Sequence, residues 1–221
     1  MRFHRSATVA LLALAVMLVL YPGDGGKPAY AATFTVDSTI DEGDSSPGDG
    51  TCSAVTTGDC TLRAAIMETN ALPGADTITL PAGAYILTIV GTGEDASATG
   101  DLDITDDHTI TGAGEAVTSI DGGGLDRVLD VLSAATNATV SASTIRNGMV
   151  SPDADGGGIR NGGILALAGV TVSDSTARAG GGIYNGLNNT LTLDDTTVTS
   201  NTATTTLGES GEAAASPTGA P

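Results

Sequence analysis

The amino-acid sequence predicts an all-β fold, a parallel β-helix (solenoid) of about five coils with a small N-terminal cap. Three observations lead to this prediction. Nearly the same six residues occur twice, GGGIRN at 156–161 and GGGIYN at 180–185, and such spacing is typical of stacked repeat units. Apolar and polar residues alternate in many short runs after Asp76, which is the period of a half-buried strand. Glycine, asparagine and aspartate separate these runs, as expected for tight turns.

Residues 1–31 are predicted to be a secretory signal peptide. Two arginines form a basic start, an apolar run extends from Ala7 to Leu20, and a small-x-small triplet ends at Ala31. The run is shorter than the ~20 residues needed to cross a bilayer, so cleavage after Ala31 is favoured over an uncleaved anchor. We therefore expect a protein that is secreted or held at the cell surface, with no membrane span after cleavage.

Cleavage would leave a strongly acidic chain with few aromatic residues. The whole chain has 8 basic and 26 acidic residues and a net charge of −18, and loss of residues 1–31 changes these values to 5, 25 and −20. No lysine remains, so the surface repels phosphate backbones and nucleic acid is not an expected partner. The remaining aromatic residues are Phe34, Tyr85 and Tyr184. This scarcity weakens the case for a sugar-stacking platform.

Residues 32–75 are predicted to form the N-terminal cap, stapled by a disulfide. Cys52 and Cys60 are the only cysteines of the chain, and an even pair in an exported protein indicates a local disulfide bond. Because the loop is short, we expect a stabilisation of only about 2–3 kcal/mol. With a single histidine left after cleavage, His108, a Cys/His zinc site is disfavoured.

The cap is also expected to contain the one convincing helix of the chain, over residues 61–71. Its apolar positions follow the i, i+3, i+4, i+7 spacing of an amphipathic helix. Thr61 is suited to cap the start, and the Pro73-Gly74 pair ends the pattern. This helix would cover the open edge of the first coil, and Arg63 would bind carbonyl groups or a carboxylate where helix and coil meet.

Residues 76–203 are predicted to be the β-helix itself, with a unit of about two dozen residues that makes three short strands and three turns. Aligning the last two units matches Ile159 with Ile183, Asn161 with Asn185, Leu165 with Leu191, Leu167 with Leu193, and Val172 with Val198. One coil earlier, Val140 and Ile145 precede Leu167 and Val172 by 27 positions. We expect the apolar residues to stack in a column, and Asn161 to lie against Asn185 at a turn.

Other repeat and all-β folds explain the pattern less well. A β-sandwich also has many short strands, but it does not predict identical turn sequences at one period. The leucine-rich pattern is absent, and "DGGGLDRVLD" is a single imperfect likeness of a calcium-binding nonapeptide. Residues 204–221 read as a low-complexity tail without core residues, and no C-terminal cap is recognisable in the sequence.

The chain resembles secreted bacterial proteins that carry the CSLREA domain. The resemblance spans roughly residues 34–203 and rests on several motifs in order: Cys60-Thr61-Leu62-Arg63-Ala64-Ala65, Asn70-Ala71, Pro73-Gly74, Asp76-Thr77-Ile78, Pro81-Ala82-Gly83, Tyr85, "GDLDIT", "TITGAG", "IDGGGLDRV" and the GGGI-N units. In the first motif Thr replaces Ser and Ala replaces Glu. The resemblance implies a right-handed parallel β-helix of the pectate-lyase-like (pectin-lyase-like) shape at the cell surface or in the medium. It supplies no catalytic residues. Relatives are often longer and end in an anchoring segment, so a truncated copy of a longer surface protein stays open.

Two acidic groups are the candidate sites. Asp101, Asp103, Asp106 and Asp107 lie beside His108, and oxygen ligands at such close spacing suit calcium. The alternative for this group is a set of solvated turn carboxylates.

The second group consists of Asp121, Asp126 and Arg127. A polysaccharide lyase would need carboxylates that hold calcium and a basic side chain such as Arg127, Arg146 or Arg160. The alternative is that Asp126 or Asp130 pairs with Arg127, or that all are merely exposed.

No catalytic set stands out in the sequence. We therefore expect a non-enzymatic secreted or cell-surface β-helix, adhesin-like or structural, with a polysaccharide or the cell envelope as its partner. A polysaccharide lyase or glycoside hydrolase on the same fold is the alternative, because sites are grafted onto folds.

Overall fold

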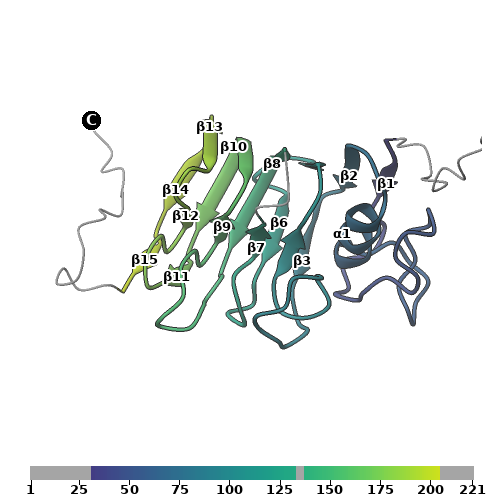
Figure 1. Ribbon diagram of the computed structural model, residues 1–221, viewed down its shortest axis with the longest axis horizontal. Coiled ribbons are helices and arrows are strands. Elements are labelled where there is room, and N and C mark those ends of the chain that lie inside the picture. The colour runs from purple at the N-terminus through teal and green to yellow at the C-terminus, as the bar shows by residue number, and fades with distance from the viewer. Residues whose placement is uncertain (1–30, 133–136, 205–221) are drawn as a thin grey trace, which may run out of the picture.

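The computed structural model describes residues 31–132 and 137–204, and it shows a parallel β-solenoid with one helix at its N-terminal end (Figure 1). The predicted signal peptide up to residue 30 and the predicted tail from residue 205 lie outside the described residues. Within the described part, no helix is both long and apolar enough to cross a membrane.

The largest sheet has nine strands, and every pairing in it is parallel. Its main path is β1 (Thr33–Thr35), β2 (Asp76–Leu80), β5 (His108–Gly112), β8 (Ala138–Arg146), β10 (Ile164–Ser173) and β13 (Thr190–Asp194). The last residues of β8 and β10 continue into a second face, where they join β3 (Gly83–Ile86), β6 (Thr118–Asp121) and β14 (Thr197–Thr199). The bend falls at left-handed residues, Ala142 with φ 50° and Gly169 with φ 60°.

Two smaller sheets complete the coils. The four-stranded sheet contains β4 (Leu102–Ile104), β7 (Leu129–Val131), β9 (Ile159–Asn161) and β12 (Ile183–Asn185), and the two-stranded sheet contains β11 (Thr176–Ala177) and β15 (Thr202–Ala203). One strand of the four-stranded sheet belongs to each turn, so the solenoid has about four turns, one fewer than the sequence predicted. The helix α1 (Leu62–Ala71) contacts β2 and β4 at the place where a further turn would lie.

The repeat alignment made from the sequence is confirmed by the strand register. Ile159 pairs with Ile183, Leu167 pairs with Leu193, and Val172 pairs with Val198. The earlier offset of 27 is also present, because Val140 pairs with Leu167. Inward-facing isoleucine, leucine and valine side chains from successive coils form one buried core.

The repeated glycines are required because successive coils approach each other closely at this corner. A Cβ atom added to Gly157 would lie 2.5 Å from the carbonyl oxygen of Gly181, and one added to Gly158 would lie 2.5 Å from that of Gly182. Gly156 and Gly180 open the two motifs in the left-handed region, with φ of 74° and 59°. The repeat of GGGIRN as GGGIYN therefore follows from stacking one bare backbone on another.

The helix covers the N-terminal end of the apolar core, as Figure 1 shows. Thr61 accepts a hydrogen bond from the backbone of Ala64, so its predicted role as the N-cap is confirmed. The four positions of the predicted apolar stripe are all buried, but so are Arg63 and Glu68 on other faces of the helix. Glu68 is covered by the loop that precedes the helix, whose Gly48 and Gly50 amides donate to its carboxylate, and Arg63 is covered by the segment from Ser97 to Asp101.

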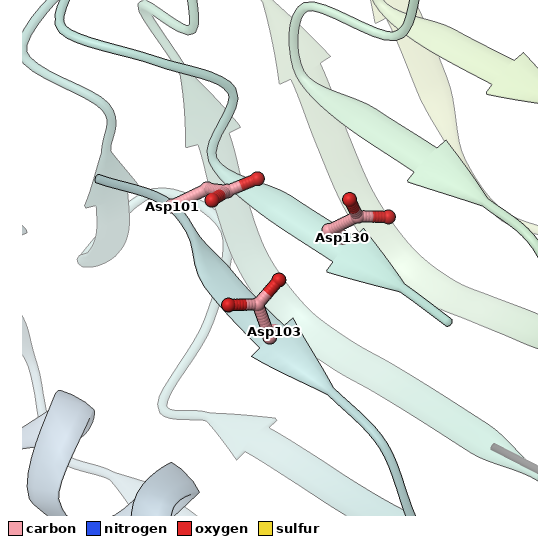
Figure 2. Close-up of side chains that lie close together, drawn as sticks. All are labelled: Asp101, Asp103 and Asp130. Atoms are coloured by element: carbon pink, nitrogen blue, oxygen red, sulfur yellow. The ribbon is translucent and has the colours of Figure 1, made fainter. Parts of the chain in front are cut away.

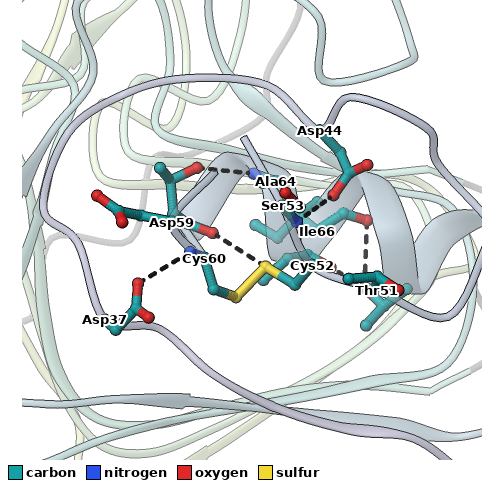
Figure 3. The surroundings of a disulfide bond; sticks show 12 residues. Asp37, Asp44, Thr51, Cys52, Ser53, Asp59, Cys60, Ala64 and Ile66 are labelled. Atoms are coloured by element: carbon teal, nitrogen blue, oxygen red, sulfur yellow. Dashed lines mark hydrogen bonds between the residues drawn. A yellow bond between two sulfur atoms is a disulfide. The ribbon is translucent and has the colours of Figure 1, made fainter. Parts of the chain in front are cut away.

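The predicted disulfide joins Cys52 to Cys60, with Cα atoms 5.0 Å apart (Figure 3). Replacing both cysteines by alanine is expected to lower the free energy of unfolding by about 2–3 kcal/mol, because the reduced loop regains conformational freedom in the unfolded chain. Urea unfolding of the variant and of the reduced wild-type protein measures the loss. Equal losses would assign it to the cross-link, whereas an unchanged urea midpoint in both would contradict the prediction.

Candidate functional site

Three carboxylates come together on the outside of the four-stranded sheet. Asp103 on β4 pairs in register with Asp130 on β7, and Asp130 pairs with Arg160 on β9. Their neighbours along each strand point into the core, so these three side chains form an outward ladder. Asp101, just before β4, completes the group, and one carboxylate oxygen from each aspartate lies within 4.8 Å of the others (Figure 2). We call Asp101, Asp103 and Asp130 the acidic site.

The acidic site faces outward but is closed to solvent. Asp101 and Asp130 are 2% exposed, and Asp103 is fully buried. The chain before β4 folds over the site, and Ser97 holds it there. The Ser97 amide donates to Asp103 Oδ2 at 2.8 Å, and the Ser97 hydroxyl contacts the Asp103 backbone.

Arg63 fixes this covering segment to the cap. Its guanidinium donates to the carbonyl oxygens of Ser97, Gly100 and Asp101 at 2.7–3.1 Å. It also forms an ion pair with Asp41, Nε to Oδ1 at 2.6 Å. Arg63 therefore binds both carbonyl groups and a carboxylate at the junction of helix and coil, the role that the sequence predicted.

Two arginines neutralise part of the charge of the acidic site. Arg127 Nη1 donates to Asp130 Oδ2 at 2.7 Å and to Asp101 Oδ2 at 3.3 Å. Arg160 Nε donates to Asp130 Oδ1 at 2.8 Å, and its Nη2 lies 2.5 Å from Asp130 Oδ2. Asp130 is thus held by two guanidinium groups, whereas Asp103 has a buried Oδ1 without a hydrogen-bond partner.

Burial, together with the neighbouring negative charge, makes two carboxyl groups of the site unusually weak acids. Burial raises the pKa of Asp101 to about 8, and the nearby charge of Asp103 adds to the effect. Burial likewise raises the pKa of Asp103 to about 7, although the hydrogen bond from Ser97 opposes the shift. At neutral pH the site therefore retains protons that exposed aspartates would lose.

The geometry fits a calcium ion only in part. Oxygens bound to one calcium at 2.3–2.6 Å lie up to about 5 Å apart, which agrees with the observed spacing. Calcium, however, takes 6–8 oxygens, and Arg127 already occupies two of the three carboxylates. A divalent ion would have to displace a guanidinium group, so the residues present suit protons and arginine better than a metal.

The structure brings together two of the four residues of the candidate calcium group, Asp101 and Asp103. Asp106 and Asp107 do not join Asp101 and Asp103, because the chain turns between them. Asp106 Oδ1 accepts from the Asp107 amide, and Asp107 Oδ1 accepts from the Asn137 amide. Asp130 completes the site instead. The sequence marks it by an aspartate between two apolar residues, which "LDI" at 102–104 and "LDV" at 129–131 share.

His108 also lies apart from the acidic site. It begins β5 and is buried against the helix, where its Nε2 lies 3.2 Å from Thr69 Oγ1 and 2.8 Å from Asn70 Oδ1. Burial lowers its pKa, so it is neutral at physiological pH. Its contacts join the helix to the first coil.

The second predicted group is divided between two places. Asp121 forms an ion pair with Arg146, Oδ2 to Nε at 2.9 Å. Asp126 accepts from the Arg127 amide and adds negative charge near Asp101. The pairing of Arg127 with Asp130, which the sequence left as an alternative, is present. Each arginine considered as a lyase base is thus bound to a carboxylate.

A small hollow lies beside Arg63. It has a volume of about 10 Å³ and lies between the loop at Thr39 and the end of β3 with Leu87. This is room for about one water molecule, far below the several hundred Å³ of a ligand pocket.

The broad face of the largest sheet is a different kind of surface, which the sequence reasoning missed. The outward residues of its first four strands are hydroxyl-bearing and exposed or half-buried, and we call them the hydroxyl face: Thr33, Thr35, Thr77, Thr79, Thr109, Thr111, Thr139 and Ser141. The hydroxyl face corresponds to the triplets TFT, TIT, TIT and TVS of the sequence. Sequence periodicity predicted the inward middle residue of each triplet and left the outward residues unassigned.

The turn predicted to stack two asparagines does so. Asn161 Nδ2 donates to Asn185 Oδ1 at 2.7 Å, and Asn161 Oδ1 accepts from the Gly163 amide. These amides join one coil to the next.

Comparison with known proteins found no matching family model, no similar curated protein and no similar solved structure. The resemblance to CSLREA-domain proteins, noted from the motifs of the sequence, therefore stays a prediction.

Proposed function

We propose that this protein is an exported β-solenoid that binds an extracellular surface without catalysis, as an adhesin-like or structural module. The proposal rests mainly on one contrast. The acidic residues that would serve chemistry are buried, and Asp101 and Asp130 are paired with arginine, whereas the hydroxyl face is exposed or half-buried and regular over four strands. The disulfide between Cys52 and Cys60 supports an oxidising, extracellular setting.

The contrast favours binding over catalysis because substrate must reach the reacting groups. A raised pKa near 7 suits a general acid, and Asp103 has one. Its carboxylate is nevertheless closed off by the segment around Ser97. The Arg127 side chain is 13% exposed and already paired with Asp101 and Asp130.

Incubation of the purified full chain with acidic and neutral polysaccharides and with bacterial envelope fragments tests the proposal. Co-sedimentation and polymer length are measured together, with calcium and with EDTA. We expect the protein to sediment with a polymer or with the envelope while the polymer length stays unchanged. The double variant Thr109→Lys/Thr111→Lys should reduce this binding, because it places two long charged side chains at the centre of the hydroxyl face.

Shortened polymer chains would overturn the proposal in favour of a lyase or hydrolase. In that case Asp101→Asn and Arg127→Ala should abolish cleavage. Absence of binding to every polymer and to the envelope would also overturn it.

A further inference from the structure

The hydroxyl face consists of two ranks of residues paired in register. Along the first rank, Thr33 pairs with Thr77, Thr77 with Thr109, and Thr109 with Thr139. In the second rank each residue likewise pairs in register with the next, in the order Thr35, Thr79, Thr111 and Ser141. The first rank continues with Ala166 and Thr192, and the second with Ala168 and Asp194. The two alanines interrupt the hydroxyls without raising a bulky side chain above the face.

The hydroxyls of this face are largely available to solvent. Within the described residues, Thr77, Thr79 and Thr109 make no side-chain hydrogen bond to the protein, and Ser141 donates at 3.3 Å to Thr111. A second set of paired threonines, Thr144 and Thr171, is hydrogen-bonded to the protein instead. Thr144 donates to the Glu115 carbonyl and Thr171 to the Glu115 carboxylate.

The spacing of the ranks is set by the fold. Neighbouring strands lie about 4.8 Å apart, and residues i and i+2 of a strand lie about 6.7 Å apart. Threonine is stiff about χ1, so each residue presents its methyl and hydroxyl groups in a restricted orientation. The oxygen atoms of hexagonal ice repeat at similar distances along the a and c axes of the crystal.

The chemistry of the face suits a neutral surface that is bound by hydrogen bonds, and an ordered layer of water is such a surface. The outward residues of its first four strands carry no charge, so neither an ionic polymer nor a hydrated ion is attracted there. They carry no aromatic ring on this face, which sugar recognition by stacking would need. Waters that bridge neighbouring hydroxyls are held by hydrogen bonds, so they repeat with the spacing of the hydroxyls themselves.

We propose that the hydroxyl face binds the surface of ice through the two ranks of threonine. This inference rests on the proposed function, since it names the ordered surface that the same face would bind. Water held between the ranks would match the lattice and freeze into it, so that the protein adsorbs to the crystal and stops its growth locally.

The test is partition of the purified full chain into a slowly growing ice crystal, together with inhibition of ice recrystallisation. The wild-type protein should be enriched in the ice, and Thr109→Lys/Thr111→Lys should lower this enrichment about tenfold or more. The matched control is Thr197→Lys/Thr199→Lys. It makes the same change in the outward positions of a Thr-Val-Thr triplet on β14, away from the hydroxyl face, and should keep wild-type enrichment.

A second variant guards against loss of fold. Thr109→Val/Thr111→Val keeps the shape and removes two hydroxyls, and circular dichroism should show native structure in it. Exclusion of the wild-type protein from ice would overturn the ice proposal, and so would equal enrichment of folded Thr109→Lys/Thr111→Lys. Co-sedimentation with polysaccharide, measured on the same preparations, distinguishes failure of the ice proposal from failure of surface binding as such.

Discussion

Replacing Arg63 by alanine is expected to lower the free energy of unfolding by about 3–5 kcal/mol, the loss typical of removing one member of a buried ion pair. The Arg63 side chain is inaccessible to solvent and pairs with Asp41. Its removal leaves the carbonyl oxygens of Ser97, Gly100 and Asp101 without their donor. Each unpaired buried group adds to the loss.

Urea unfolding measures the effect, and hydrogen exchange locates it. We expect faster exchange of the Ser97 and Thr99 amides, because Arg63 no longer holds their segment over the first coil. Arg178→Ala is the control, since its ion pair with Asp155 is half-exposed and should change stability by about 0–1 kcal/mol. A loss below about 1 kcal/mol for Arg63→Ala would contradict the assigned role.

Raising the pH from 6.5 to 8.5 is expected to destabilise the protein by on the order of 2 kcal/mol through the acidic site. The folded-state pKa of Asp101 is about 8 and that of Asp103 about 7, both above the ordinary value of 3.8. The folded state therefore holds protons that the unfolded chain has released. Their contribution is fully present below about pH 4 and is lost as the pH rises through about 7 and 8.

The window from pH 6.5 to 8.5 separates the titration of the acidic site from that of His108 and Tyr85. His108 has a lowered pKa, so its contribution is lost as the pH falls and lies mainly below the window. Tyr85 has a raised pKa and titrates above the window. Asp76 and Asp126 also have raised pKa values, because of burial, and act in the same direction as the acidic site.

The measurement is the urea midpoint at both pH values for the wild-type protein and for Asp101→Asn. The amide stays neutral, so the variant should lose less stability across the window than the wild-type protein does. Asp153→Asn, at an exposed position, is the control and should follow the wild-type curve. An unchanged wild-type midpoint would contradict the prediction. Recovery of stability at pH 8.5 with calcium, but not with EDTA, would show that a cation and not protons neutralises the site.

The pairing of coils could be predicted from the sequence because it depends on local patterns. The triplets around Ile159 and Ile183 repeat at one spacing, and the structure pairs them as the alignment required. The Thr61 cap was equally predictable, since a side chain that accepts from the third following amide is a local feature.

The acidic site could be predicted only in part because it is made between coils. Asp101 and Asp103 are two residues apart in the sequence, but Asp130 reaches them through strand register across a whole turn. Asp106 and Asp107 follow within four residues of Asp103, yet the turn before β5 directs them elsewhere. Spacing along a chain does not determine distance once a coil intervenes.

The sequence by itself determined the repeat, the inward apolar column, the disulfide partners and the position of the helix. All of these follow from periodicity, from turn residues or from a count of cysteines. Only the tertiary structure decided that Arg63 is buried, that Asp103 is closed off by the segment around Ser97, and that the threonine triplets align in two ranks. Burial and register depend on which segment covers another, and residues far apart in the chain set both.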